Sequence, residues 1–414
     1  MRFLYTLSIY FYTLFIRIAS LVNEKARKWI IGRRGILTNI KQDLAENTDK
    51  IIWFHCASLG EFEMGKPVIE LLRQKHPQLK ILITFFSPSG YEIRKNHEGG
   101  DYIYYLPVDT PQNARKFIKL VKPIAAVFIK YEFWFNYINE LKNSDIPLFS
   151  ISAVFRKDQH FFKWYGGWFR KHLKFFSWIY VQTNISNQLL QNIGIQNVTT
   201  SGDTRFDRVI GTVSNTKELP LIETFSRNSR IFVAGSSWHP DEEVYLKTCI
   251  ENCKDIKLII APHDVSENRI ASIEKKIDKP TIRYSKIAEG DQIQQDILII
   301  DSIGILANIY RYADLAFIGG AFGSGLHNIL EAVAFGCPVF FGPKNDKFWE
   351  ASTLAEKGGA FIVKSEQEFK EHYIKLINNE KYYQQCSEVC KNFVEENSGG
   401  SNIIANGILK VLTF

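Results

Sequence analysis

ADLAFIGGAFGSGLHNILEAVAFGCPVFFG, residues 313–342, carries the clearest α/β pattern of this chain. Residues 315–318 form a short apolar run typical of a buried strand, and glycines follow it directly. The pattern predicts a helix over residues 328–335 and a second strand that begins at Pro338. Strand, glycine-rich turn, helix and strand in this order indicate a parallel α/β sheet.

The glycine-rich turn indicates a nucleotide site. Glycines at the carboxyl end of a strand let backbone amides approach a ligand, and a helix start favours phosphate. His327 and Asn328 lie at the predicted helix start, and the Glu331 carboxylate follows at a position suited to ribose hydroxyls. The turn could also serve packing alone, because residues 323–325 lack the third glycine of the dinucleotide fingerprint. Spacing leaves both interpretations open.

Strand and helix patterns alternate along the chain from Lys50 onward. Predicted strands are residues 51–55, 81–85, 102–106, 124–129, 147–151, 231–234, 257–261, 297–300 and 315–318. Continuous apolar strands between amphipathic helices predict two doubly wound, Rossmann-like parallel sheets. We expect one domain over residues 46–210, a polar linker at 211–218, and a second domain over 219–414 that includes the last helices.

The composition limits the partners of the protein. The chain has 414 residues and a formal net charge of +7, which suits an anionic membrane surface or phosphorylated substrates. It contains no zinc-finger or RNA-recognition signature, so we expect no nucleic-acid partner. The six cysteines have no metal-site spacing and are expected to be reduced, buried thiols.

Residues 1–45 have the character of a membrane anchor. Residues 3–22 are apolar and aromatic apart from Arg17, and several cations follow without an acidic residue between Lys25 and Lys41. The unbroken apolar part is too short to span a bilayer upright, so we expect it to lie in or dip into the membrane. The cations then face the anionic cytoplasmic surface. A buried first helix is the alternative.

The aromatic and basic segment 154–178 likewise suits either a membrane interface or a helix packed on the domain.

Two carboxylates follow predicted strands directly. Glu61 comes after the first strand and Gly60, and Glu132 comes after the fourth strand. Because ligands bind beyond the carboxyl ends of parallel strands, either carboxylate could act there as a general base. The alternative is that both are first-turn residues favoured by a helix dipole.

Several motifs resemble those of the 3-deoxy-D-manno-octulosonic acid (Kdo) transferases. GGAFGSGLHNILEAVAFGCPVFFGPK at residues 319–344 resembles their donor-site signature, with Leu326 and Ile329 in place of a glycine and a proline. SLGE at 58–61 is similar to their SVGE, whose glutamate is the catalytic base. KYEFWFN at 130–136 resembles ETE.WPN, with Lys130 in place of the first glutamate. SGDTRFD, GSSWHPDEE, Pro262-His263 and DSIGIL have counterparts in the same order, with His263 and Ile305 replacing an arginine and a glutamate.

The resemblance implies a GT-B fold, with a membrane-anchor helix before two facing domains. It also implies an inverting transfer of Kdo from CMP-Kdo to a lipid A precursor in lipopolysaccharide core biosynthesis, at the cytoplasmic face of the inner membrane. Its expected site residues are catalytic Glu61 and Glu132, further active-site candidates Ser58, Gly60 and Arg205, and donor-binding Ser236, Ser237, Pro262, His263, Gly304, Ile305, Leu306, His327, Asn328, Ile329, Leu330 and Glu331. The sequence has no Asp-x-Asp motif, so we expect neither a metal nor a cofactor. There are two alternatives. The chain could be another GT-B nucleotide-sugar transferase or epimerase, or it could be a non-catalytic membrane-bound nucleotide-sugar binding protein.

Overall fold

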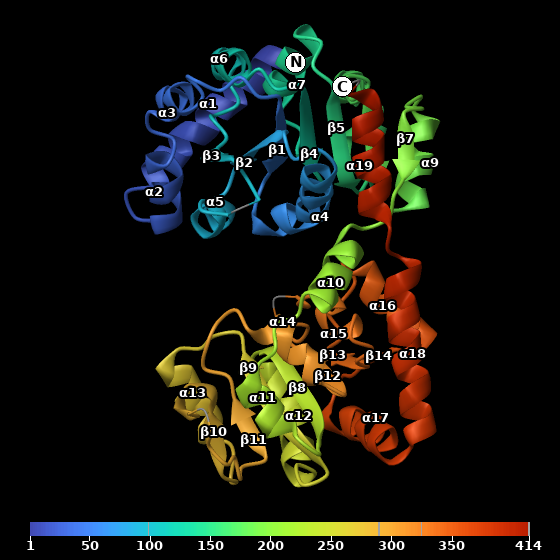
Figure 1. The fold of residues 1–414 in the computed structure, drawn as a ribbon. Coiled ribbons are helices and arrows are strands. Elements are labelled where there is room, and N and C mark those ends of the chain that lie inside the picture. The colour runs from blue at the N-terminus through green and yellow to red at the C-terminus, as the bar shows by residue number, and fades with distance from the viewer. Residues whose placement is uncertain (98, 289, 324, 413–414) are drawn as a thin grey trace. The chain divides into compact units, whose positions relative to one another are not determined.

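The computed structural model describes residues 1–97, 99–288, 290–323 and 325–412. The chain divides into two compact units (Figure 1). Unit 1 comprises Met1–Arg208 together with Ser398–Phe414, and unit 2 comprises Val209–Asn397. Each unit contains a seven-stranded sheet in which the strands pair in parallel. The predicted pair of doubly wound sheets is therefore confirmed.

Unit 1 is built on the strand order β3-β2-β1-β4-β5-β6-β7. Its strands are β1 Ile51–Cys56, β2 Lys80–Phe85, β3 Tyr102–Tyr105, β4 Ala125–Ile129, β5 Leu148–Ala153, β6 Trp178–Val181 and β7 Val198–Thr200. Its helices are α1 Arg2–Ala19, α2 Glu24–Ile31, α3 Ile36–Asp43, α4 Leu59–Lys75, α5 Pro88–Arg94, α6 Pro111–Val121, α7 Phe135–Asn143, α8 Gly167–Leu173, α9 Asn184–Asn192, α19 Gly400–Val411 and the first residues of α10 Arg205–Ser214. The strand order reverses direction between β1 and β4, which is where ligands bind in such sheets.

Unit 2 repeats this design with the order β10-β11-β9-β8-β12-β13-β14. Its strands are β8 Arg230–Ser237, β9 Ile256–Pro262, β10 Thr281–Arg283, β11 Ile297–Ile299, β12 Leu315–Ile318, β13 Val339–Phe341 and β14 Ala360–Ile362. Its helices are α11 Pro220–Ser226, α12 His239–Glu251, α13 Glu267–Glu274, α14 Leu306–Ile309, α15 Leu330–Val333, α16 Trp349–Lys357, α17 Glu366–Asn378 and α18 Glu380–Glu396. Here the reversal falls between β8 and β12, so the glycine-rich turn after β12 lies at the switch point.

The continuous apolar character of the strands follows from burial on both faces of each sheet. In unit 1, Trp53 of β1 packs into the cluster formed with α6 and α7, and its neighbour Phe54 packs into the opposite cluster formed with α4 and α19. Both side chains are fully buried. A parallel sheet covered by helices on both sides leaves no solvent face for polar residues.

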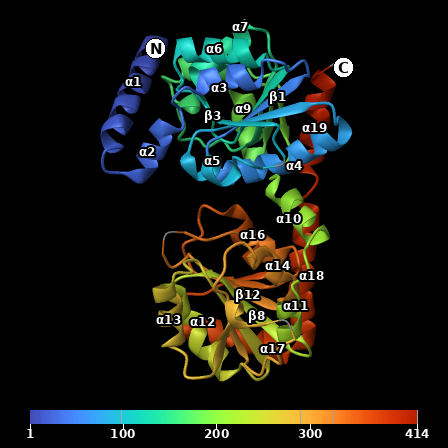
Figure 2. The same ribbon diagram turned by 60° about the vertical axis from the view of Figure 1, so that its left-hand side comes forward.

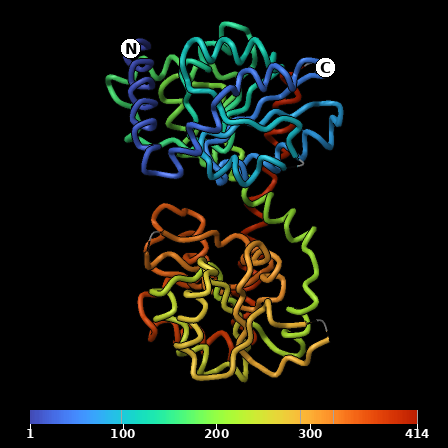
Figure 3. Tube along the Cα trace, turned by 90° about the vertical axis from the view of Figure 1, so that its left-hand side faces the viewer, coloured from blue at the N-terminus to red at the C-terminus, as the bar shows by residue number. Residues whose placement is uncertain are grey.

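The last helix differs from the predicted domain boundary. α19 belongs to unit 1, where Ile404 and Ile408 are fully buried in the cluster that covers β1 and α4 (Figure 1 and Figure 3). The Asp207 carboxylate fixes its start by accepting hydrogen bonds from the backbone N–H groups of Gly399 (2.6 Å) and Ser401 (2.9 Å). The second domain therefore does not include this helix. The expected linker at 211–218 also begins inside a helix, because α10 continues to Ser214.

The N-terminal helix α1 lies against the side of unit 1 beside α2 (Figure 2). None of its residues is fully buried, and Phe3 and Phe15 are 77% and 66% exposed. On its inner side, the Tyr5 hydroxyl donates to Asp109 Oδ2 over 2.6 Å. No helix among the described residues is long and apolar enough to cross a membrane.

Most rings of the aromatic and basic segment 154–178 pack on the sheet. Phe161 and Phe176 are buried, and Trp168 lies 4.7 Å from the Phe135 ring. Trp164 and Tyr165 are exceptions, at 92% and 49% exposed. The packing interpretation of this segment therefore holds for most of its rings, because they complete the core over α7.

Candidate active site

Glu132 lies just beyond the carboxyl end of β4, within a group of buried aromatic side chains. The turn starts at Lys130, whose φ of 66° lies in the left-handed region. Glu132 Oε2 is 3.0 Å from His55 Nε2 and accepts a hydrogen bond from Trp134 Nε1 over 2.5 Å. The Glu132 side chain is 11% exposed, and His55 is fully buried. The carboxylate is therefore held by two nitrogen groups and is nearly withdrawn from water.

His55 is itself held in place from the neighbouring strand. Its Nδ1 atom lies 2.8 Å from the Thr84 hydroxyl of β2, and that oxygen accepts a hydrogen bond from Trp53 Nε1 over 2.8 Å. The chain of contacts runs across β2, β1 and the end of β4, which are adjacent strands. Sequence reasoning did not select His55 or Trp134. A histidine inside an otherwise apolar strand is the signal that could have pointed to the first.

Glu61 lies in the first turn of α4, which begins at Leu59. The Ser58 hydroxyl donates to Glu61 Oε2 and makes no capping bond to the helix backbone. Burial raises the pKa of the Cys56 thiol, and the negative charges of Glu61 and Glu132 raise it further. Glu61 follows β1 and Glu132 follows β4, which pairs with β1, so both carboxylates come from the switch point of unit 1.

Arg205 of the predicted set is engaged by a neighbouring carboxylate. Its Nε and Nη2 atoms donate to Asp203 Oδ2 over 2.9 and 2.6 Å, and Asp203 is buried. Paired in this way, the guanidinium is oriented at the start of α10. Gly60 is exposed on the first turn of α4.

In unit 2, the ends of β8 and β12 come into close contact. A Cβ atom on Gly319 would lie 2.3 Å from the Ser236 carbonyl oxygen, so only glycine fits there. Asp241 of α12 accepts hydrogen bonds from the backbone N–H groups of Trp238 (2.8 Å) and Gly320 (3.0 Å). The two turns are thereby tied together. Ser237 is buried and accepts a hydrogen bond from Tyr245.

Three rings stack beside these turns. The Trp238 and His263 rings are 4.6 Å apart, and the His263 and His327 rings are 4.7 Å apart. Trp238 Nε1 lies 3.3 Å from His327 Nε2 and donates to it. Burial lowers the pKa of His327, and the charge of His263 lowers it further. The structure thus brings together His327 and His263, which follows Pro262 at the end of β9.

The helix after the glycine-rich turn is shorter than predicted. α15 covers only Leu330–Val333, four residues, because the preceding backbone folds back and His327 N donates to Gly319 O over 3.1 Å. A single turn aligns few peptide dipoles, so its macrodipole is a weak phosphate attractor. Asn328 Nδ2 donates to Glu331 Oε1 over 3.2 Å. Ile329 and Leu330 are buried and offer no side chain to a ligand. Ser324 of this turn lies outside the described residues.

The remaining donor-site candidates follow β11. Gly304 is exposed with a φ of 94°, and α14 starts at Leu306. The Leu306 side chain lies 3.3 Å from where a Cβ on Gly235 would stand, which places it beside the turn of β8. Ile305 forms the N-cap of α14 and is partly exposed.

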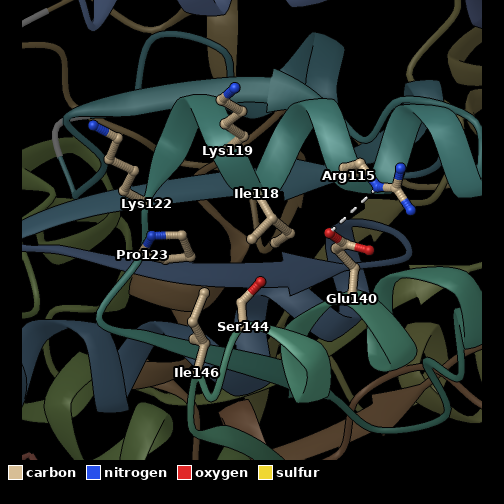
Figure 4. Close-up of a pocket in the computed structure, with 8 residues that line it drawn as sticks. All are labelled: Arg115, Ile118, Lys119, Lys122, Pro123, Glu140, Ser144 and Ile146. Atoms are coloured by element: carbon tan, nitrogen blue, oxygen red, sulfur yellow. Dashed lines mark ion pairs between the residues drawn. The ribbon is translucent and has the colours of Figure 1, made fainter.

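A separate cavity of about 440 Å³ lies between α6 and α7 (Figure 4). Arg115, Lys119 and Lys122 line it, and Arg115 Nε lies 3.9 Å from Glu140. Pro123 and Ile146, also in its wall, precede β4 and β5. The cavity therefore lies at the amino ends of the strands, opposite the edge that holds Glu61 and Glu132.

Two parallel seven-stranded sheets, each with polar groups gathered at its switch point, define a GT-B-like α/β protein. The UDP-GlcNAc 2-epimerase from Neisseria meningitidis has this fold, with a TM-score of 0.62, 18% identity, and coverage of 87% of this chain and 100% of that one. MurG from Acinetobacter baumannii aligns with a TM-score of 0.54 and 13% identity over 87% of this chain and 99% of its own.

Sequence comparison finds similar proteins. The family model described as 3-Deoxy-D-manno-octulosonic-acid transferase (kdotransferase) matches residues 31–208. The 3-deoxy-D-manno-octulosonic acid transferase of Aquifex aeolicus is 29% identical over 81% of this chain and 88% of its own length. That of Rickettsia bellii is 27% identical over 96% of both chains. By sequence, this chain is therefore similar to the Kdo transferases over most of its length.

Proposed function

We propose that this chain moves Kdo from CMP-Kdo to a hydroxyl of a lipid A precursor in lipopolysaccharide core biosynthesis, with inversion at the anomeric carbon. The observation that carries this proposal is the pair of carboxylates, Glu61 and Glu132, at the β1/β4 switch point of unit 1. A protein that only binds a nucleotide sugar needs no carboxylate there. Similarity to the Kdo transferases supports the choice of donor and acceptor.

In the proposed reaction, Glu61 takes the proton of the acceptor hydroxyl as that oxygen bonds to the anomeric carbon of Kdo. The bond from that carbon to the CMP phosphate oxygen breaks at the same time, and CMP leaves with the electron pair. Glu132, held by His55 and Trp134, stays in place as a second carboxylate for the acceptor or the developing positive charge. In unit 2, His263 and His327 are the groups proposed to meet the phosphate.

Attachment to the cytoplasmic face of the inner membrane is part of the proposal. The outward side of α1 exposes Phe3, Leu14, Phe15 and Ile18, and many cations follow between residues 25 and 41. Apolar side chains that enter the headgroup region and cations that meet anionic lipids favour a helix lying on the membrane. A lipid acceptor would then meet the enzyme at the surface in which it is embedded.

The test is to incubate the full chain with CMP-Kdo and a lipid A precursor and to follow the acceptor by mass spectrometry. We expect the acceptor mass to increase by one or more Kdo units, with UDP-N-acetylglucosamine inactive as donor. EDTA should leave the rate unchanged, because the sequence has no Asp-x-Asp motif. Transfer from the UDP-sugar instead, or epimerised free nucleotide sugar, would replace this function by one of the alternatives.

A further inference from the structure

Two cavities flank the helix pair α1–α2, and Trp29 lines both. The first, which we call the apolar cavity, has a volume of about 300 Å³ and is lined by Tyr12, Ile16, Trp29, Phe86 and Pro88, with Lys25 also in its wall. The second, the arginine cavity, has a volume of about 500 Å³ and is lined by Thr13, Arg17, Ser20, Trp29, Arg33 and Arg34. The α1–α2 helix pair thus places the apolar cavity next to the arginine cavity, with Trp29 in the wall of both.

The arginines of the arginine cavity have no carboxylate partner among the described residues, and the Arg33 guanidinium is instead stacked over the Trp29 ring, 3.8 Å from its centroid. Neither Arg17, Arg33 nor Arg34 lies within 4.0 Å of a carboxylate among the described residues. Arg33 donates to the carbonyl oxygens of Leu106 (2.8 Å) and Phe86 (2.7 Å), and burial lowers its pKa to about 9. It therefore remains a cation at neutral pH. A cation withdrawn from water without a counter-charge is costly, and a bound anion would offset that cost.

Trp29 adds an independent observation. Its side chain is 5% exposed, and its indole N–H has no hydrogen-bond partner among the described residues. A buried donor without an acceptor is uncommon, because burial removes the water that would otherwise satisfy it. An oxygen-rich ligand between the two cavities would supply the missing acceptor.

The apolar cavity is linked to the catalytic carboxylates through stacked rings. Phe86 in its wall stacks on Tyr12 at 6.1 Å and on Trp134 at 4.7 Å. Trp134 in turn donates to Glu132. A ligand that contacts Phe86 therefore lies against the same group of stacked rings as Glu132. An acceptor must lie near the reacting groups, whereas a site for bulk membrane lipid need not.

We propose that the α1–α2 cavities bind the phosphorylated, acylated sugar acceptor itself, with a phosphate in the arginine cavity and the start of an acyl chain in the apolar cavity. The charge of the phosphate complements three arginines, and the chain matches the apolar lining. The assignment rests on the proposed function, because it names where that function's acceptor is held.

The test compares the double variant Arg17→Gln/Arg34→Gln with the wild-type chain. The side chains of both arginines are exposed and form no hydrogen bond or ion pair within the described part of the chain. Arg33 donates to three backbone carbonyls and is left intact. The control is Lys119→Gln/Lys122→Gln in the α6–α7 cavity, which removes the same charge from the same unit (Figure 4). Each protein is assayed in neutral detergent micelles, with the phosphorylated acceptor and with its phosphatase-treated form, and each acceptor is titrated by calorimetry.

We expect the double variant to raise KM and Kd for the phosphorylated acceptor about tenfold, as loss of charge-assisted hydrogen bonds to one phosphate predicts. The turnover number and the KM for CMP-Kdo should stay within about twofold, since neither is set by these charges. For the phosphatase-treated acceptor the variant and wild type should agree, and the control pair should match wild type throughout.

Four results would overturn the site. One is an equal loss with the dephosphorylated acceptor, and another is an equal loss in the control pair. The third is a difference that appears only when phosphatidylglycerol is added, which would assign the arginines to bulk lipid. The fourth is competition by inorganic phosphate alone at equal affinity. If wild type transfers no Kdo, the proposed function fails, while the calorimetric Kd values still decide whether the cavities hold a phosphorylated acceptor.

Discussion

The indole N–H of Trp134 donates to Glu132 Oε2 over 2.5 Å, on the side of the carboxylate that also faces His55 Nε2. The two residues are separated by only one position, so this bond closes a tight turn at the end of β4. Because the Trp134 ring also stacks on Phe86, the donor cannot rotate away without breaking that stack. The carboxylate is thus positioned before any substrate arrives.

Trp134→Phe tests this positioning directly. Phenylalanine keeps the ring stack on Phe86 and loses the N–H donor, so Glu132 should lose one of its two nitrogen contacts. We expect kcat to fall about tenfold, equivalent to ~1.4 kcal/mol of lost hydrogen bonding, with little change in melting temperature. Trp164→Phe, at a ring that is 92% exposed, is the control. Unchanged turnover in Trp134→Phe would remove Trp134 from the reaction.

Glu61→Gln should lower kcat by roughly 10²- to 10⁴-fold, the usual contribution of a general base. The amide retains the shape and can still accept from Ser58, so substrate KM values should change little. If Glu61 serves only as a carboxylate stabilised by the helix dipole, the change should cost about 0.3 to 1 kcal/mol of stability and leave kcat unchanged. Glu70→Gln, at an exposed carboxylate on the same helix, is the matched control. The measurement is steady-state kinetics with a melting curve for each protein.

Tyr5→Phe should destabilise unit 1 in a pH-dependent way. Burial raises the pKa of Asp109 to about 6, and the hydrogen bond from Tyr5 opposes that rise by favouring the carboxylate. Without the hydroxyl, the pKa of Asp109 should rise further. A carboxyl with a raised pKa costs stability once pH exceeds the unfolded value, so the loss should be larger at pH 7.5 than at pH 5.

At pH 7.5 the loss for Tyr5→Phe should be about 1.5 to 3 kcal/mol, the range for hydrogen bonds to charged groups. Urea unfolding at the two pH values measures it. Tyr104→Phe removes a bond of the same length, 2.6 Å, to the Asp43 carboxylate at the surface. That control should cost less and show no such pH dependence. Equal costs at both pH values would contradict the assignment to Asp109.

His263→Gln should raise the pKa of His327, because the charge of His263 is one of two causes that lower it. Burial, the larger cause, remains, so the pKa should stay below the usual histidine value. Since a lowered histidine pKa makes stability fall as pH drops below about 6.5, the variant should lose less stability between pH 7 and 5. Histidine NMR titration measures the shift, and no upward movement would show that the two rings do not interact.

The triple change Phe3→Gln/Phe15→Gln/Ile18→Gln should weaken binding to anionic vesicles by at least about tenfold, because each side chain would otherwise bury apolar area. All three are more than half exposed, so the melting temperature should hardly move. The control triple Ile93→Gln/Ile185→Gln/Ile403→Gln alters equally exposed apolar residues outside α1. A similar loss of vesicle binding in both triple variants would contradict the anchor proposal. So would a wild-type protein that does not bind anionic vesicles.

The sheets could be predicted because buried parallel strands leave an unbroken apolar signal, as Leu315–Ile318 of β12 shows. Glu61 and Glu132 could be singled out because each follows such a strand directly. The role of His55 could not, since its contact with Glu132 depends on β1 lying next to β4, although 77 residues separate the two side chains. The residues around His55 and Glu132 do not reveal that β1 and β4 are neighbours in the sheet.

Helix boundaries failed for a related reason. Leu326 and Ile329 have helical spacing and are buried, but they precede α15, because the backbone at His327 bonds back to Gly319. The family resemblance contributed the donor and acceptor, which neither periodicity nor spacing could have supplied.

The return of α19 to unit 1 has a consequence for biosynthesis. Its side chains Ile404 and Ile408 complete the core over α4, so unit 1 cannot close until these residues have left the ribosome. By then all of unit 2 has been synthesised, and the unfinished face of unit 1 must stay soluble during that time. Unit 1 therefore begins first in the chain but is completed after unit 2. A chaperone that covers α4 would act in that interval.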